Sequence, residues 1–265
     1  MKLLLKLQYD GSRYCGFQVQ KNGESVQGVL CRAGEELFGF PVNITGCSRT
    51  DAGVHALGFC AAIEPKDPAK REEVWTSIPL GRLHRALNQR LPDDIAVTAA
   101  AAVADDFHPR YDVKEKEYVY RIWDCPCRSP FLKGRAMDLK RCISSEEEAL
   151  MRRVAEMYVG KRDFAGFMAS GSKIMDSVRC VSRTAIFRDA EGCLCFSVRA
   201  DGFLYNMVRI MVGTLLDCVR GAVSESDVRA ALDTADRSRA GFTAPPEGLY
   251  LKEVFYEKEI PFACE

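Results

Sequence analysis

The sequence predicts an α+β fold with a mixed, mainly antiparallel sheet. Some segments alternate apolar and polar residues with a period of two, as half-buried strands do, and others repeat apolar residues every three or four positions, as helices do. Several strands follow one another across short turns instead of alternating regularly with helices, which argues against a doubly wound sheet. At 265 residues, the chain can bury a full core without disulfides or metal, as one large domain or two smaller ones.

The first part of the chain begins with an alternating strand, in which Leu3, Leu5 and Leu7 share one face. Asp10-Gly11-Ser12 then breaks the pattern. Ser25 is a plausible N-cap for a helix that runs to about residue 37 and is stopped by Gly39. Further apolar patterns predict strands over 42–47, 58–63 and 95–103, and a helix over 79–91.

The segment Asp105-Asp106-Phe107-His108-Pro109 predicts a boundary between two subdomains, 1–105 and 106–265. Beyond it, Ser144 precedes Glu147 by three residues, a capping-box pattern for a helix that Gly160 would end. A hairpin should turn across Ala190-Glu191-Gly192. The patterns predict strands over 117–123, 181–189, 194–200 and 249–256, and a long apolar helix over 203–219.

The charge balance argues mildly against a nucleic-acid partner. The chain has 37 Lys plus Arg and 37 Asp plus Glu, so its formal net charge is zero, whereas phosphate binding requires clustered positive charge. Net charge does not locate the charges, however. A neutral chain can still line one cleft with arginine.

The 12 cysteines predict reduced thiols in the cytoplasm and not a disulfide framework. The run Met1–Leu7 is too short for a secretory signal and is interrupted by Lys6, and no apolar stretch is long enough to span a membrane. The close pairs Cys125/Cys127 and Cys193/Cys195 have one intervening residue, whereas zinc ligands are usually separated by two to four. We therefore expect no metal site and cysteines that mostly fill the core.

The run Arg49-Thr50-Asp51-Ala52-Gly53 follows a predicted strand and could project one carboxylate into a cleft. Gly53 allows a backbone conformation that other residues resist. The alternative is an ordinary Asx-type turn. The segment by itself favours the turn, because most Asp-Ala-Gly runs are only turns.

Two other residues have both a structural and a functional interpretation. Arg209 lies in an otherwise apolar helix, where its guanidinium must reach water or meet a buried carboxylate; Asp51 is a candidate partner, because a nearby guanidinium favours an ionised carboxylate. Tyr118 lies on a strand behind the charged run Lys114-Glu115-Lys116-Glu117. A strand tyrosine is more often part of the core, but an exposed one could stack on a nucleobase.

Several segments together resemble the tRNA pseudouridine synthases of the TruA family. These segments follow the order of the family's segments over nearly the whole chain. A chance match would be confined to one short motif. The loop at Asp51 departs from the family pattern at Ser48, where the family usually has glycine, and we expect the loop to tolerate this. The resembling blocks are 9–11 with 16–18, 25–28, 48–56, 107–111 with 116–120, 163–167 with 177–179, 202–209 and 245–249.

The resemblance implies the pseudouridine synthase fold, two related α/β subdomains with a central cleft, and no cofactor. It implies isomerisation of uridine at positions 38, 39 and 40 of tRNA, with Asp51 forming a covalent bond to the nucleotide. Arg209 would pair with Asp51, and Tyr118 would pack on the target base and could assist proton removal. Arg49 would fill the space of the flipped nucleotide, and His55 would help shape the loop. Family members are usually homodimers.

Three alternatives remain open from the sequence. One is a pseudouridine synthase with another RNA target. A second is a non-catalytic RNA-binding protein that retains the scaffold, although all the proposed catalytic positions are present. The third is a glycosidase, which usually needs two carboxylates flanking the bond; the resembling blocks offer no second candidate beside Asp51.

Overall fold

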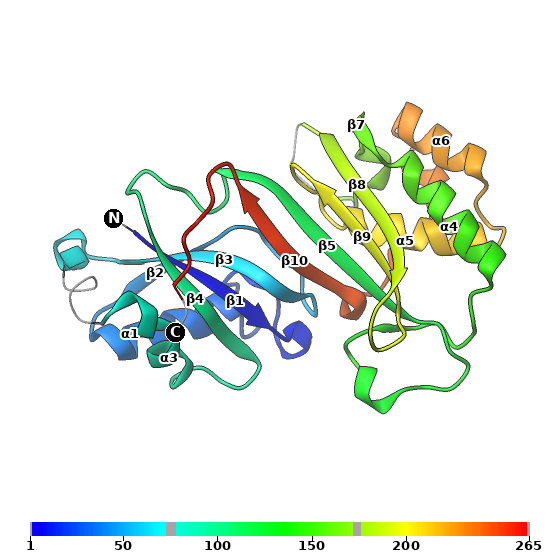
Figure 1. Ribbon diagram of the computed structural model, residues 1–265. Coiled ribbons are helices and arrows are strands. Elements are labelled where there is room, and N and C mark those ends of the chain that lie inside the picture. Colours follow the sequence, from blue (N-terminus) through cyan, green and yellow to red (C-terminus); the bar gives the residue numbers. More distant parts are fainter. Residues whose placement is uncertain (1, 73–77, 172–175, 264–265) are drawn as a thin grey trace. The chain divides into compact units, whose positions relative to one another are not determined.

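The computed structural model describes residues 2–72, 78–171 and 176–263 (Figure 1). The chain forms two compact units, Met1–Lys114 with Leu251–Glu265, and Glu115–Tyr250. The sequence predicted a division at residue 105. The first unit continues beyond that point, and the C-terminal residues return to it because the last strand takes a place beside β3. Each unit combines a mainly antiparallel sheet with helices, so the predicted α+β class is confirmed.

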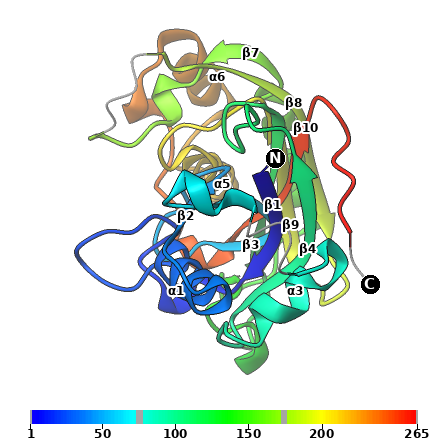
Figure 2. The same cartoon turned by 90° about the vertical axis from the view of Figure 1, so that its left-hand side faces the viewer.

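The sheet of the first unit has the strand order β4-β1-β3-β10, and β2 also pairs with β3. β1 is antiparallel to both β3 and β4, and β2 is antiparallel to β3. Helices α1 and α3 lie side by side near this sheet (Figure 2). The elements are β1 (Lys2–Tyr9), α1 (Val26–Phe38), β2 (Val42–Gly46), β3 (His55–Pro65), α3 (Leu80–Asn88), β4 (Ile95–Val103) and β10 (Leu249–Tyr256).

Helix α1 begins and ends as its sequence predicts. The hydroxyl of Ser25 accepts a hydrogen bond from the backbone N–H of Gly28, which satisfies one free donor of the first turn. Gly39 ends the helix with a φ of 76°, a left-handed conformation that glycine adopts without strain. The helix packs on the sheet at Gly34, where an added Cβ would lie 2.8 Å from Val42 and 3.0 Å from Ile63. This anchors α1 against the strand that leads into the Asp51 loop.

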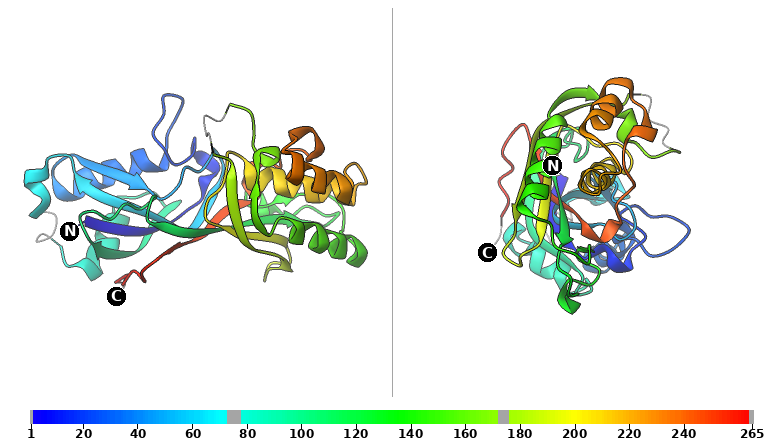
Figure 3. Two further views of the ribbon diagram at one scale, coloured as in Figure 1. Left: turned by 90° about the horizontal axis from the view of Figure 1, so that it is seen from above. Right: turned by 90° about the vertical axis from the view of Figure 1, so that its right-hand side faces the viewer.

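The sheet of the second unit has the order β5-β9-β8-β7, all antiparallel, and a short β6 pairs parallel with β5. Helix α4 packs on α5, α6 and β8, and α5 appears end-on beside the strands in the right-hand view of Figure 3. The elements are β5 (Val113–Trp123), β6 (Met137–Asp138), α4 (Ser145–Met157), β7 (Gly160–Asp163), β8 (Val178–Arg188), β9 (Leu194–Ala200), α5 (Met207–Val219) and α6 (Glu225–Thr234).

The second unit confirms the predicted hairpin and the capping box but corrects two helix boundaries. Ser144 and Glu147 exchange the two hydrogen bonds of the box. The long apolar helix begins at Met207 and not at residue 203, because Asn206 has a left-handed φ of 58° that no helix continues through. Gly160, expected to end α4, opens β7 instead with a φ of 115°. The amphipathic helix α6 was not predicted.

The cysteines of the described residues are all free thiols. Those that are buried support the prediction of cysteines as small core residues, whereas Cys127 and Cys142 are exposed. No group of three His, Cys, Asp or Glu side chains within the described ranges could hold a metal ion. Among the helices of the described residues, none has both the length and the apolar character needed to cross a bilayer. The buried cysteines are Cys47, Cys60, Cys193, Cys195 and Cys218.

Burial raises the pKa of four tyrosines, and this predicts that the protein loses stability in alkaline solution. The folded protein keeps these phenols protonated, whereas the unfolded chain ionises them near pH 10, so the free energy of unfolding should fall as pH rises above about 10. Each such group contributes a slope of up to about 1.4 kcal/mol per pH unit. The tyrosines are Tyr14, Tyr120, Tyr158 and Tyr256.

Urea unfolding at several pH values from 8 to 11.5, with phenolate absorbance recorded in parallel, checks this. Part of the absorbance change should appear only when the protein unfolds. Full phenolate absorbance in a protein that is still folded at pH 11 would contradict the burial of these rings.

Candidate active site

The Asp51 loop connects β2 to β3 in the first unit. Cys47 extends the pairing of the two strands, because its N–H donates to the carbonyl of Cys60 at 2.9 Å. The N–H of Val54 then donates to the carbonyl of Asp51 at 3.2 Å, and Gly53 has a φ of 78°. The backbone of this segment is therefore the turn that its composition favours. The turn leaves the Asp51 side chain half-buried and that of Arg49 exposed.

The segment from Tyr9 to Phe17 holds this loop from one side. The hydroxyls of Tyr9 and Thr50 are 2.9 Å apart in a buried hydrogen bond. The N–H of Phe17 donates to the carbonyl of Thr50 at 3.1 Å, and the N–H of Gly53 donates to the carbonyl of Tyr14 at 3.3 Å. These three bonds flank Asp51 on both sides along the chain, so its backbone has little freedom to move.

Two glycines make this close approach possible. A Cβ on Gly11 would overlap the carbonyl oxygen of Val54, and one on Gly16 would overlap that of Thr50. Gly16 also has a φ of 89°. The sequence did not assign a role to either glycine, although both lie in blocks that resemble the TruA family.

His55 is the first residue of β3 and is only 1% exposed. Its Nδ1 accepts a hydrogen bond from the N–H of Gly11 at 3.1 Å and also lies 3.2 Å from Oδ1 of Asp10. One nitrogen cannot accept the first bond and donate a proton to the second. The backbone N–H of Gly11 points at Nδ1 and can only donate to it. A neutral ring with an unprotonated Nδ1 therefore fits this contact better than a ring with a proton on Nδ1. A ring buried in this way supports the shape of the loop; contact of His55 with substrate remains a prediction.

Ser48 fits the loop without strain. Among the described residues, the only non-glycines with positive φ are Lys140, Asn206 and Ala235. Ser48 therefore has a backbone conformation open to any L-residue. Serine and glycine can therefore both adopt the backbone conformation found at this position.

Tyr118 lies on β5 in the second unit and is 6% exposed. Its ring meets that of Phe203 edge to face, with centroids 4.9 Å apart and an interplanar angle of 81°. Phe203 belongs to the irregular segment that precedes α5. The contact fixes the orientation of the Tyr118 ring. The ring is largely buried, as is usual for a tyrosine on a strand, and its packing on a target base stays a prediction.

Arg209 lies in the first turn of α5 and is held by two hydrogen bonds within the second unit. Its Nε donates to the carbonyl of Ala244 at 2.7 Å, and its Nη1 donates to Oδ1 of Asn206 at 2.8 Å. The N–H of Ala244 donates in return to the carbonyl of Arg209 at 3.0 Å. The side chain is only half-buried. These bonds orient the guanidinium. The ion pair between Arg209 and Asp51 stays a prediction.

Tyr120 is a residue of this site that the sequence did not single out beyond its place on the strand. It is fully buried, and its hydroxyl donates to the carbonyl of Pro245 at 2.7 Å. Burial raises its pKa, and the nearby Glu247 adds to the shift while Arg209 opposes it. Tyr120 and Arg209 thus bind neighbouring carbonyls of one segment. The Pro-Pro-Glu-Gly run at 245–248 was the available sequence signal.

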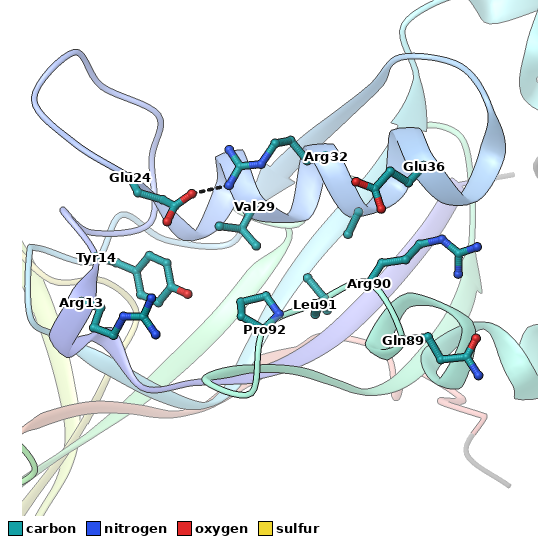
Figure 4. A pocket seen from close by; sticks show the side chains of 11 residues that line it. Arg13, Tyr14, Glu24, Val29, Arg32, Glu36, Gln89, Arg90, Leu91 and Pro92 are labelled. Carbon is teal, nitrogen blue, oxygen red and sulfur yellow. Dashed lines mark hydrogen bonds and ion pairs between the residues drawn. The ribbon is translucent and has the colours of Figure 1, made fainter.

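The structure therefore groups the predicted residues into two sets. Arg49 and Asp51 lie in one loop of the first unit, and His55 begins β3 directly after it. Tyr118 and Arg209 lie on β5 and α5 of the second unit. A cavity of about 530 Å³ lies elsewhere in the first unit, between α1 and the 89–92 segment (Figure 4), and none of the predicted site residues lines it. Three arginines and two glutamates line it, and Arg32 pairs with Glu24, so its charges are largely balanced. Tyr14 lines this cavity, and its carbonyl accepts the hydrogen bond from Gly53 of the Asp51 loop.

Sequence comparisons identify the family. The profile that describes tRNA pseudouridine synthases matches residues 7–112 and 154–257. A tRNA pseudouridine synthase A of Ruminiclostridium cellulolyticum is 36% identical over 255 residues, covering 96% of this chain and 99% of that protein. The one from Thermoanaerobacter sp. strain X514 is 40% identical over 254 residues, again covering 96% and 99%.

A third relative, from Acetivibrio thermocellus, is 40% identical over 252 residues, with 95% and 98% covered. Among solved structures, a chain of a Cbf5-Nop10-Gar1 complex aligns with a TM-score of 0.38 and 10% identity over 96% of this chain and 50% of that one, a likeness too weak to support a conclusion. The profile match spans both units and includes Asp51, and the relatives align over almost their whole length. The chain thus belongs to the tRNA pseudouridine synthase family.

Proposed function

We propose that this protein converts uridine to pseudouridine at positions 38, 39 and 40 in the anticodon stem-loop of tRNA, with Asp51 as the nucleophile. The observation that supports this most is the loop of the first unit. Asp51 lies in the block that resembles the TruA family, and hydrogen bonds to its neighbours Thr50 and Gly53 hold it in place. A nucleophile needs such a pre-set position to approach one atom of a bound substrate.

The reaction breaks the N1–C1′ bond of uridine, turns the uracil and forms a C5–C1′ bond. The proton on C5 is lost, N1 gains a proton, and no electrons are exchanged with another molecule. The Asp51 carboxylate would bond to the nucleotide while the base turns and would be released when the new bond is complete. Attack at C1′, attack at C6 and a glycal route all satisfy this balance.

The other residues would serve the flipped nucleotide. Arg209 would pair with Asp51 and keep it ionised, since a nearby positive charge favours the carboxylate. Tyr118 would pack against the uracil and could assist removal of the C5 proton. The exposed Arg49 would occupy the gap left in the RNA and support the extruded base.

The implied partner is the anticodon arm of tRNA, and scattered Arg and Lys side chains would contact its phosphates without reading its bases. We further propose that the protein acts in the cytoplasm as a homodimer without a resident cofactor, as the resemblance to the family implies.

The direct test is an assay on an unmodified tRNA transcript with uridines at positions 38, 39 and 40, each labelled with tritium at C5. Formation of pseudouridine releases the label into water. Matched transcripts that keep only one of the three uridines give the activity at each position. A transcript with cytidines at all three, but with labelled uridines elsewhere, serves as the control. Equal release from that control, or release from none of the transcripts, would contradict the proposed substrate.

A further inference from the structure

We propose that Asp94 is a positioning residue for Asp51, and that it acts through the phenol of Tyr14. The inference rests on the proposed function, because it presumes that Asp51 is the reactive group. Asp94 lies just before β4, outside the loop and outside the segment that touches the loop directly. Asp94 also lies outside the blocks that resemble the TruA family.

The contact between the two side chains is short and partly buried. The hydroxyl of Tyr14 donates to Oδ1 of Asp94 at 2.5 Å, and the Tyr14 side chain is 4% exposed. A hydrogen bond to an ionised acceptor is shorter and stronger than one between neutral groups. Burial and the neighbouring Asp94 carboxylate both raise the pKa of Tyr14, so the phenol stays protonated and remains a donor.

Asp94 also holds the start of the same segment. Its backbone carbonyl accepts a hydrogen bond from the N–H of Asp10 at 2.9 Å. Its Oδ2 lies 3.2 Å from Nη1 of Arg13, but that arginine side chain is 74% exposed, so the ion pair contributes little. The bond from Tyr14 is therefore the contact through which the Asp94 side chain fixes the segment 10–17.

The segment passes this constraint on to the Asp51 loop. The carbonyl of Tyr14 accepts the N–H of Gly53, two residues beyond Asp51. The next residues, Gly16 and Phe17, are in backbone contact with Thr50 on the other side of Asp51. A shift of Tyr14 would therefore displace both flanks of the nucleophile together. Figure 4 shows Tyr14 and Arg13 at one end of the cavity, where both contribute to its lining.

The structure also explains why Tyr14 would move without Asp94. The bond to Asp94 is the hydrogen bond that fixes the Tyr14 ring, and removing either partner releases the ring. Tyr14 lines the cavity, so a released ring has space into which it can turn. We expect the ring to turn toward that cavity and its backbone to follow.

The test compares Asp94→Ala with Asp94→Asn and with the matched control Asp93→Ala, which removes the exposed carboxylate next to it in the chain. In the tritium-release assay, Asp94→Ala should lower kcat by about 10- to 100-fold, as expected for a misplaced reactive group. KM for tRNA should change less than about twofold. Asp94→Asn retains an acceptor for Tyr14 and should recover most of kcat, and Asp93→Ala should match the parent protein.

Tyr14→Phe provides a second route to the same contact and keeps the ring that fills the core. It should lower kcat as Asp94→Ala does, and the double variant should be no slower than the slower single variant, because both substitutions break one bond. The positioning role would be rejected if the fold-losses in kcat of the two single variants multiplied in the double variant. A rise in KM with unchanged kcat would also reject it. Should Asp94→Ala not fold, Tyr14→Phe and Asp94→Asn still decide the question. Normal turnover by Asp51→Asn would instead overturn the proposed function itself.

Discussion

Asp51→Asn should lower kcat for pseudouridine formation by at least about a thousandfold, which corresponds to roughly 4 kcal/mol of lost transition-state stabilisation. The amide has nearly the same size and shape as the carboxylate but cannot form the covalent bond. The backbone contacts of the loop come from Thr50, Gly53 and the carbonyl of residue 51. None of these contacts involves the Asp51 carboxylate, so they should survive the change to asparagine, which keeps the side chain's size.

Single-turnover assays with excess enzyme, together with filter binding of tRNA, measure the two effects separately. The dissociation constant for tRNA should stay within about threefold of the parent value, a change of less than 1 kcal/mol. Asp51→Ala guards against slow hydrolysis of the introduced amide back to the acid and should be equally inactive. Asp106→Asn, at an exposed aspartate after β4, is the control. Turnover by both Asp51 variants at more than a tenth of the parent rate would exclude Asp51 as the nucleophile.

Gly16→Ala should destabilise the protein by about 3 kcal/mol and greatly reduce turnover. The backbone at Gly16 has a φ of 89°, which costs an L-residue about 1–2 kcal/mol. The added Cβ would also overlap the carbonyl oxygen of Thr50 and lie 3.2 Å from the carbonyl carbon of Asp51. Overpacking against backbone typically costs a further 1–3 kcal/mol, since a backbone group cannot rotate away as a side chain can. The loop that carries the nucleophile must therefore shift.

Gly39→Ala separates these two causes. Gly39 also has a positive φ, 76°, but an added Cβ there meets nothing within 4 Å. The Gly39→Ala variant should lose about 1 kcal/mol of unfolding free energy, which is the conformational cost alone, and its kcat should be unchanged. Urea unfolding and the tritium-release assay on both variants give the comparison. Equal destabilisation of the two, with equal turnover, would show that the contact between Gly16 and the loop does not constrain Asp51.

Much of the local structure was predictable because it depends on neighbouring residues. The alternation in β1, the N-cap of α1 at Ser25 and the capping box of Ser144 and Glu147 each involve groups a few positions apart. The start of α5 was predicted four residues too early, and the cause is also a local one. Asn206 adopts a left-handed conformation, which its apolar surroundings in the sequence did not indicate. The return of β10 to the first unit is a long-range pairing that no local pattern encodes.

For the site, the sequence by itself predicted which residues belong to it, through several collinear segments that resemble one family. The profile match confirms the family, and the roles of the site residues stay predictions. By composition alone, Asp51 was one more aspartate in a turn, and the structure shows that its backbone is indeed a turn. Only the tertiary structure decided what holds that turn. Tyr9, Tyr14, Gly16 and Asp94 lie far from Asp51 in the chain, and their contacts arise when β1, β3 and β4 pair and bring their ends together.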